Sequence, residues 1–208
     1  TRAEGTGMGP FARDGAYYSA RIDRRSLLLL RQLVSEILVV LDDPSDAEEM
    51  SIMVSASTGP EVKRDAPVER SLEFLLPPMS ADAQTAQSLR ALTEDIVRSD
   101  KSRRLRVFWR ILDGAVPVRG RPWASDSDEA DLRVRAADAW QCLGALNDIR
   151  LGLAGELGMA TASDAEAVEA LAMSEPTGEH TQSVAIIYML ITWWQDSLLT
   201  AMQEHHED

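Results

Sequence analysis

The sequence predicts a mainly α protein, a single-domain helical bundle that carries a small N-terminal β-hairpin. Long segments repeat apolar residues with the period of an α-helix, whereas alternation with period two is confined to short stretches. The 208 residues suit one domain, and 45% of them are hydrophobic, which is enough to fill a core without disulfides or metals. The single cysteine also excludes an intramolecular disulfide.

The N-terminal region is expected to form a leader and then the hairpin. Residues 1–10 contain three glycines and one proline, and we expect them to be a disordered leader. A single helical domain is expected over residues 11–208. Within it, Asp14-Gly15 supplies the positive φ of a tight turn, because glycine tolerates that conformation. The flanking stretches are prone to form strands, so residues 11–22 are expected to be the hairpin.

The first helix is expected to begin after Asp23, whose carboxylate suits an N-cap, and to end near Leu41. Its large apolar residues fall on one stripe at about 100° per residue, so this helix has a core face. Pro44 ends the helical pattern, because a proline restricts the residue before it. A short helix is expected over residues 47–54, and residues 55–67 are the best candidate for a linker.

The middle of the chain is expected to be mostly helical. Residues 69–76 predict one or two helical turns that stop at a pair of prolines. A helical region follows over residues 80–112, capped by its first residue, a serine, and formed by two helices or by one with a break near residues 93–95. Residues 116–118 and 132–134 are expected to pair as a second small β element.

The C-terminal third is expected to hold three helices. The first covers residues 136–157 and ends at Gly158, since glycine is the usual residue after a helix. Ser163 and Glu166 have the spacing of a capping box, which predicts a second, short helix. The last helix is expected to begin at Thr181 as its cap and to run to about residue 203. It is apolar almost all round, so it is expected to be the central helix of the bundle.

The charge distribution bears on nucleic-acid binding. The net charge is −13, although residues 98–121 hold eight basic and two acidic residues. An acidic body disfavours nucleic acid, since affinity depends on neutralising phosphates. Arg103, Arg106 and Arg110 share the solvent side of their predicted helix, so a DNA-binding regulator that uses them is one alternative. No helix-turn-helix pattern accompanies them, and we therefore interpret them as a solvated basic face without a nucleic-acid partner.

Four polar residues lie on or beside apolar helix faces. Lys101 is in the middle of one stripe, and Gln195 lies among apolar residues of the last helix. Arg150 is at the centre of a third stripe, with Asn147 near its edge. A buried unpaired cation costs several kcal/mol, so both cations need partners or water. The candidate carboxylate partners are Glu94, Asp95, Asp196 and Glu36.

Three interpretations of these polar residues stay open. They form a buried polar network that fixes the register of the helices, an anion pocket between helices, or half-exposed side chains that reach solvent. The anion pocket would place Lys101 and Arg150 around one carboxylate or phosphate.

Residue types that carry catalysis or bind metals are few. His180, His205 and His206 have no partner at the spacing of a helical metal site. Cys142 has no histidine within helical reach, so a buried apolar role is expected rather than a nucleophile. The sequence also lacks a glycine-rich phosphate loop and a nucleophile elbow. We therefore expect no metal, no cofactor and no catalytic site.

The apolar runs bear on location. The longest covers residues 184–191, which is shorter than the roughly 20 residues that span a membrane. No signal-peptide pattern opens the chain. We expect a cytoplasmic protein without a membrane partner.

Three segments resemble a known family. Residues 140–151 resemble the Trp-x5-Leu-Asn-Asp-Leu-Arg-Leu signature of an actinobacterial family, the domain-of-unknown-function family number two thousand and seventeen. Residues 188–199 are similar to its second signature, and residues 69–112 are similar to its middle block. The chain departs from the family pattern in the longer segment 119–129 and at Asp196, where glutamate is commoner.

The resemblance implies an intracellular protein from a family with no assigned activity. Members are often encoded beside the Clp-protease adaptor ClpS, which implies a link to proteostasis by association. The acidic body and the apolar last helix favour a non-catalytic protein that acts through protein-protein contacts, as a homodimer or a Clp-linked adaptor. The other alternative is a binder or enzyme of a small anionic ligand held by Lys101, Asn147, Arg150 and Gln195.

Overall fold

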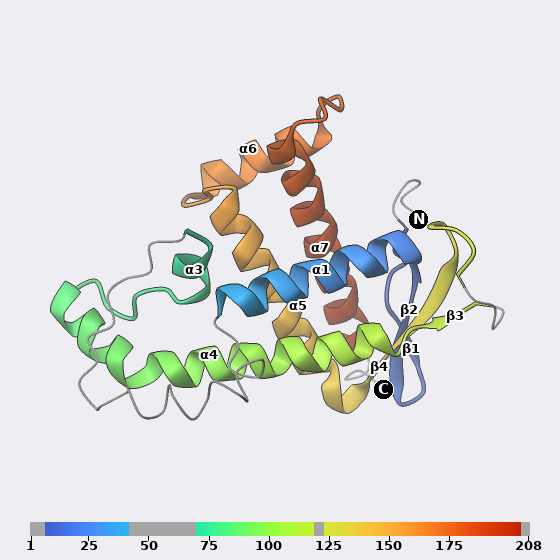
Figure 1. Cartoon of the computed structure of the whole chain (residues 1–208), viewed down its shortest axis with the longest axis horizontal. Helices are drawn as coiled ribbons and strands as arrows, with labels where there is room; N and C mark the ends of the chain where they lie inside the picture. Colours follow the sequence, from blue (N-terminus) through green and yellow to red (C-terminus); the bar gives the residue numbers. More distant parts are fainter. Residues whose placement is uncertain (1–6, 42–69, 119–122, 205–208) are drawn as a thin grey trace.

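A computed structural model describes residues 7–41, 70–118 and 123–204. The expected short helix at 47–54 and the linker at 55–67 lie outside these residues. The fold is mainly α, as predicted, with a small antiparallel sheet at one end of the helices (Figure 1). Its strands and α-helices, in chain order, are β1 (Ala12–Asp14), β2 (Tyr17–Asp23), α1 (Arg24–Val40), α3 (Arg70–Leu75), α4 (Ala83–Asp113), β3 (Val116–Pro117), β4 (Glu129–Arg135), α5 (Ala139–Glu156), α6 (Ala162–Met173) and α7 (His180–Gln203).

One four-stranded sheet, in the order β1-β2-β4-β3, unites both predicted β elements. The hairpin turn is confirmed, because Gly15 has a φ of 60° and β1 pairs with β2 across it. β3 and β4 also pair, but Val116 lies opposite Asp131 rather than within 132–134. The sequence did not predict that β2 and β4 pair along their whole length. This pairing joins the hairpin to the middle of the chain.

Residues 7–10 belong to the folded molecule, which corrects the expected leader over residues 1–10 for this part of it. Met8 is 4% exposed and forms an isolated bridge with β2. The carbonyl of Gly9 accepts a hydrogen bond of 3.0 Å from the indole Nε1 of Trp194 in α7. The segment therefore connects the sheet to the last helix.

α1 begins and ends where predicted. The carboxylate of Asp23 accepts a hydrogen bond of 2.7 Å from the backbone N–H of Ser26, and the helix stops at Leu41. The buried apolar residues of α1 are Leu27, Leu30, Leu33, Val34 and Ile37. This stripe packs against α4 and α5.

α4 is one unbroken helix, so the expected break near residues 93–95 is wrong. The hydroxyl of Thr93 donates a hydrogen bond of 2.8 Å to a carbonyl one turn back, so this side chain is satisfied within the helix. The N-cap is Asp82 rather than Ser80, and its carboxylate accepts a hydrogen bond of 2.8 Å from the N–H of Thr85. The N-terminal end of α4 extends beyond the other helices (Figure 1).

The helix at the centre of the molecule is α5, which corrects the prediction for α7. α5 contacts α1, α3, α4 and α7 (Figure 1). Its small residues allow such close packing. At Gly152, a Cβ would lie 2.3 Å from Cδ1 of Ile37, so α1 packs against bare backbone. The predicted first turn at residues 136–138 is a 3-10 turn, and Gly158 follows the helix with a φ of 68°, as expected.

α6 has a capping box, but its residues differ from the predicted Ser163 and Glu166. The hydroxyl of Thr161 accepts a hydrogen bond from the N–H of Asp164, and the carboxylate of Asp164 accepts one from the N–H of Thr161. Both pairs have the same three-residue spacing, so the pattern alone does not choose between them. The helix starts two residues earlier than predicted.

α7 begins at His180 with Glu179 as its N-cap, so Thr181 lies inside the helix and the predicted cap is wrong. Of the helices in the described residues, it is the one long and apolar enough to cross a membrane by length and composition, which the longest apolar run did not predict. Only 33% of its most apolar window is buried. The buried side includes Trp194, whose ring centroid lies 4.7 Å from that of Phe11.

Candidate functional site

A cavity of about 550 Å³ opens between α3, the segment that follows α3, and α4. The lining residues combine an apolar wall with charged groups. The apolar wall is formed by Phe74, Leu75, Leu76, Pro77, Pro78, Met79, Ile96, Val97 and Leu151. The charged lining residues are Arg90, Glu94, Asp100, Lys101 and Arg104. We call this cavity the α3–α4 groove.

Lys101 is buried at the groove, as its place on the apolar stripe of α4 predicts. It is 8% exposed, and its Nζ donates a hydrogen bond of 2.5 Å to Oδ1 of Asp148 in α5. Asp148 is 0% exposed. The partner of Lys101 is thus Asp148, which was not among the four expected carboxylates, Glu94, Asp95, Asp196 and Glu36.

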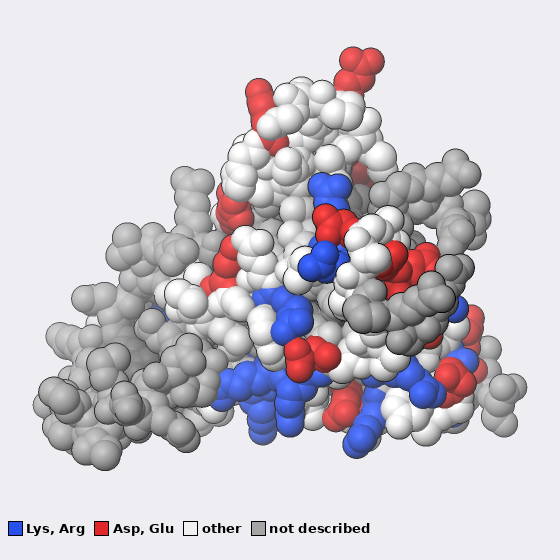
Figure 2. All heavy atoms as spheres, turned by 45° about the vertical axis from the view of Figure 1, so that its right-hand side comes forward, with Lys and Arg blue, Asp and Glu red and all other residues white. Residues whose placement is uncertain are grey.

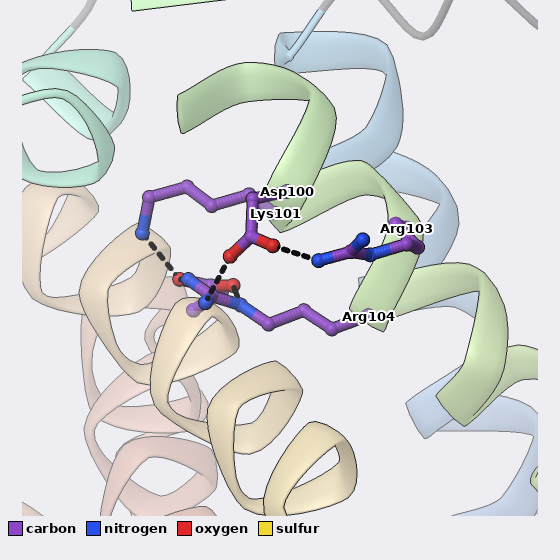
Figure 3. A network of polar contacts seen from close by, with 5 residues as sticks. Asp100, Lys101, Arg103 and Arg104 are labelled. Atoms are coloured by element: carbon purple, nitrogen blue, oxygen red, sulfur yellow. Dashed lines mark hydrogen bonds and ion pairs between the residues drawn. The ribbon is translucent and has the colours of Figure 1, made fainter. Parts of the chain in front are cut away.

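Arg104 completes this contact and was missed by the sequence analysis. It projects from α4 toward α5, and its Nε and Nη2 donate to the two carboxylate oxygens of Asp148, the second bond being 2.9 Å long (Figure 3). Its Nη1 donates a hydrogen bond of 3.2 Å to Asp100, which also pairs with Arg103. Burial alone would lower the pKa of Arg104, but Asp148 and Asp100 raise it, so the guanidinium stays charged.

The contact of Lys101 and Arg104 with Asp148 forms because α5 is buried on more than one side. Asp148 and Arg150 lie two residues apart, so they point about 160° away from each other on the helix. Asp148 is therefore on the side of α5 opposite the apolar stripe that contains Arg150. At Gly144, one turn before Asp148, a Cβ would lie 2.9 Å from Cδ of Arg104. This glycine in the middle of an apolar helix, one turn before an acid, is the signal that could have indicated the contact.

A second buried carboxylate also holds two cations beside the groove. Glu94 is 7% exposed, and its oxygens accept hydrogen bonds of 2.9 Å from Nε of Arg98 and 3.4 Å from Nη1 of Arg90. Arg98 also donates a hydrogen bond of 3.1 Å to the carbonyl of Leu41 at the end of α1. Three cations and two carboxylates line the groove, although the chain as a whole is acidic.

Arg150 lies on the other side of α5 from Lys101, between α5 and α7. Its Nη1 donates a hydrogen bond of 2.9 Å to Oε1 of Gln195, and its guanidinium lies 5.6 Å from the centroid of the Tyr188 ring. The structure thus brings Arg150 and Gln195 together but separates both from Lys101. Asn147 is half-buried and makes no side-chain hydrogen bond with a described residue. The alternative of one pocket around all four residues therefore does not match this arrangement.

The signature run contributes to both clusters, since residues 140–151 include Asp148 and Arg150. The family model described as Domain of unknown function (DUF2017) matches residues 8–202. The chain belongs to the DUF2017 family. No curated protein and no solved structure matches it. In this DUF2017 protein, the signature run supplies the carboxylate of Asp148 to the contact between α5 and α4. It also supplies the guanidinium of Arg150 to the contact between α5 and α7.

The basic residues of α4 in this DUF2017 protein do not share one environment. Figure 2 shows basic side chains gathered along the lower edge of the molecule, where α4 runs in Figure 1. Arg103 and Arg110 are exposed, whereas Arg106 is half-buried, so the predicted common solvent face is only partly formed. Arg103 pairs with Asp100. The DNA-binding alternative stays a prediction.

The buried position of Cys142 confirms the structural role expected for it. Cys142 is buried, and burial, with a smaller effect from Asp138, raises the pKa of its thiol well above the usual range. His180 is exposed and lies 2.7 Å from Oε1 of Glu156. Within the described residues, no group of three His, Cys, Asp or Glu side chains could hold a metal ion. His205 and His206 lie outside these residues.

The α3–α4 groove of this DUF2017 chain suits binding better than proton transfer. The two carboxylates in its lining, Glu94 and Asp100, each accept hydrogen bonds from arginine side chains, so neither is free to act as a base. The hydroxyl of Thr93, in the lining, donates to a carbonyl of its own helix. What the groove offers a ligand is an apolar wall and the cationic groups of Arg90, Lys101 and Arg104.

Proposed function

We propose that this DUF2017 protein is a non-catalytic cytoplasmic protein that acts through protein-protein contacts, and that the α3–α4 groove receives a segment of its partner. The observation that carries this proposal is that the apolar wall continues out of the groove. Met79 and Ile96 line the groove and are also 55% and 70% exposed, and Leu92, one turn before Ile96, is 75% exposed. Contiguous apolar surface of this kind marks interaction sites. A small ligand within the groove would leave this outer surface uncovered.

The charges of the groove define the partner segment further. Its lining has one more cation than carboxylate, in a chain with a net charge of −13. Lys101 donates one hydrogen bond to a described residue, and an ammonium group has three N–H donors. We infer that the segment carries apolar side chains next to a carboxylate, since that combination matches both the wall and the remaining donors.

The experiment compares two surface variants at equal exposure. The double variant Leu92→Glu and Ile96→Glu places charge on the outer apolar surface, and Met173→Glu places it at an equally exposed site on α6, since Leu92 and Met173 are both 75% exposed. Tagged proteins are used to purify partners from lysate of the source organism, and purified ClpS is titrated separately. We expect one protein at stoichiometric yield with the wild type and with Met173→Glu, and at least about a tenfold loss with the double variant. Equal capture by all three proteins would contradict the proposal.

A second candidate function is the binding of a small anionic ligand within the same groove. Its volume of about 550 Å³ falls in the range of ligand pockets, and Lys101 and Arg104 lie in its lining. Arg150 takes no part, because it lies on the other side of α5. Phosphate and citrate should then raise the melting temperature above that in sodium chloride at equal ionic strength. Arg90→Gln should reduce that difference. An equal melting temperature in all three salts would rule out this candidate for these ligands.

A further inference from the structure

We propose that a second groove, between α1 and α5, binds a segment of a partner protein in which Lys or Arg side chains lie next to apolar ones. α1 crosses α5 (Figure 1) and packs Ile37 on the bare backbone of Gly152. A cavity of about 440 Å³ opens at this crossing, and we call it the α1–α5 groove. It shares no lining residue with the α3–α4 groove, so the two sites are separate.

The wall of the α1–α5 groove is apolar and comes from both helices. Four of its side chains are buried, whereas Val39 is 74% exposed. The wall therefore continues from the core to the surface, and apolar surface of this kind marks interaction sites. A small inorganic cation in the groove would leave this surface uncovered. The apolar lining residues are Leu33, Ile37, Val39, Val40, Ile149 and Leu153.

The charged side chains of the groove are all negative. Glu36 and Glu156 line it, and no Lys or Arg is among the described residues that do so. Oε1 of Glu36 accepts a hydrogen bond of 2.8 Å from the amide of Gln32, which is neutral and leaves the charge in place. Glu156 contacts His180, an exposed side chain outside the lining. A bound Lys or Arg would therefore meet two carboxylates beside an apolar wall.

The ends of both helices add to the negative potential of the groove. Part of its lining comes from the last turns of α1 and α5. The C-terminal end of a helix carries a partial negative charge that favours cations, yet neither last turn contains a basic residue. Arg98 reaches the carbonyl of Leu41 after α1, but it does not line the groove. The potential therefore favours a cationic occupant.

The charge of the chain itself argues for a different protein as the occupant. Residues 42–49, which follow Leu41 in the sequence, contain five Asp or Glu and no Lys or Arg. A second copy carries a net charge of −13. Both complement the two carboxylates poorly, because like charges brought together in a contact weaken it. A segment with cations next to apolar side chains complements the charge and the wall together.

The first test asks which peptides bind in this groove. Random peptides displayed on phage are selected on the full chain, after removal of those that also bind the double variant Glu36→Gln and Glu156→Gln. This variant removes both carboxylates and keeps the size of each side chain. We expect the remaining peptides to share Lys or Arg next to apolar residues. Circular dichroism shows whether the variant is folded.

The second test measures one selected peptide, synthesised with a fluorescent label, by anisotropy. The double variant Glu36→Gln and Glu156→Gln should raise its dissociation constant at least about tenfold. Glu166→Gln with Glu169→Gln is the matched control, because it removes the same net charge from exposed residues of α6 outside the lining. That control should change the constant less than about twofold, since salt screens distant charges.

A third comparison tests the apolar wall with the same peptide. Val39→Ser should raise the dissociation constant at least about threefold, because it removes apolar surface that the peptide buries. Met173→Ser is the control, since Met173 on α6 is 75% exposed and Val39 is 74% exposed. It should leave the constant unchanged. Replacing the apolar residues of the peptide by serine should weaken binding at least about tenfold.

Several results would each overturn the proposal. They are a selection that yields no peptide specific to the wild type, specific peptides without Lys or Arg, equal losses in the two glutamine double variants, and equal effects of Val39→Ser and Met173→Ser. The peptide should also bind the variant Leu92→Glu and Ile96→Glu as tightly as the wild type. Weaker binding there would place the peptide in the α3–α4 groove, so this outcome is separate from that of the proposed function.

Discussion

Asp148 is the residue on which the contact between α4 and α5 depends. It is 0% exposed, and its two oxygens accept three hydrogen bonds from Lys101 and Arg104. Removing a carboxylate from water costs several kcal/mol, which such contacts offset only when their geometry is satisfied. The cluster therefore contributes more to fixing how α4 lies on α5 than to net stability.

We expect Asp148→Asn to lower the free energy of unfolding by about 3 kcal/mol, because it leaves the buried Lys101 without a charged partner. Urea denaturation followed by circular dichroism measures this change. Asp100→Asn is the control, since Asp100 contacts Arg104 but its side chain is 45% exposed. That control should cost less than about 1 kcal/mol. Similar losses of unfolding free energy in both variants would show that the burial of Asp148 does not increase the cost of removing its charge.

Cys142 provides a second prediction at the scale of one residue. Burial, and to a lesser degree Asp138, raises the pKa of its thiol, so the reactive thiolate is scarce in the folded protein. A disulfide reagent such as DTNB should modify it at least about a hundredfold more slowly in the native protein than in urea. Equal rates would place this side chain at the surface.

At the scale of single elements, the N-terminal ends of α1, α4 and α6 have short polar side chains that accept hydrogen bonds from free backbone N–H groups. Asp23 caps α1 as predicted, whereas Asp82 replaces Ser80 at α4 and Thr161 replaces Ser163 at α6. Each wrong prediction is two residues away from the observed cap. The chemistry of a cap is local and was predicted, but neighbouring candidates have the same chemistry.

The cap of α6 predicts a pH dependence. Hydrogen bonds from the backbone N–H groups of Ala160 and Thr161, and then from the Thr161 hydroxyl, lower the pKa of Asp164. A lowered folded-state pKa stabilises the protein above the ordinary value near 3.9, and this contribution is lost as the pH falls through the folded-state pKa. The stability difference between the wild type and Asp164→Asn should therefore be constant above about pH 5 and shrink below about pH 4. Urea denaturation across this range measures it, and a constant difference would contradict the assignment.

At the scale of the whole molecule, the N-terminal segment connects elements that are distant in sequence. Residues 7–10 lie along β2, and Gly9 accepts a hydrogen bond from Trp194 of α7. The ring of Phe11 packs against the same indole in a tilted arrangement. Together with the pairing of β2 and β4, this segment connects the two ends of the described chain through one sheet.

Met8→Ala tests this connection. Met8 is 4% exposed, so we expect a loss of about 2–3 kcal/mol in the free energy of unfolding. Met173→Ala changes the same side chain at a site that is 75% exposed, and it should stay within about 0.5 kcal/mol of the wild type. Urea denaturation measures both variants. Equal free energies of unfolding for the wild type and Met8→Ala would mean that the N-terminal segment behaves as the leader that its composition suggests.

The sequence by itself determined the elements with local causes: the hairpin at Gly15, the cap at Asp23, the helical periodicity and the end of α5 at Gly158. It also indicated that Lys101 is buried. Tertiary structure alone decided that Lys101 pairs with Asp148, that Arg150 lies apart with Gln195, and that β2 pairs with β4.

The sequence could not predict these partners because a helical wheel compares only the faces of a single helix. It ranks the faces of one helix by their own hydrophobicity, so it placed the apolar α7 at the centre and gave no reason to expect Asp148, opposite the apolar stripe of α5, to be buried. Burial instead depends on how closely neighbours can approach, and the small residues of α5, such as Gly144 and Gly152, admit helices from several sides. A charge on such a helix is then buried with a partner from another element, and no local pattern specifies that partner.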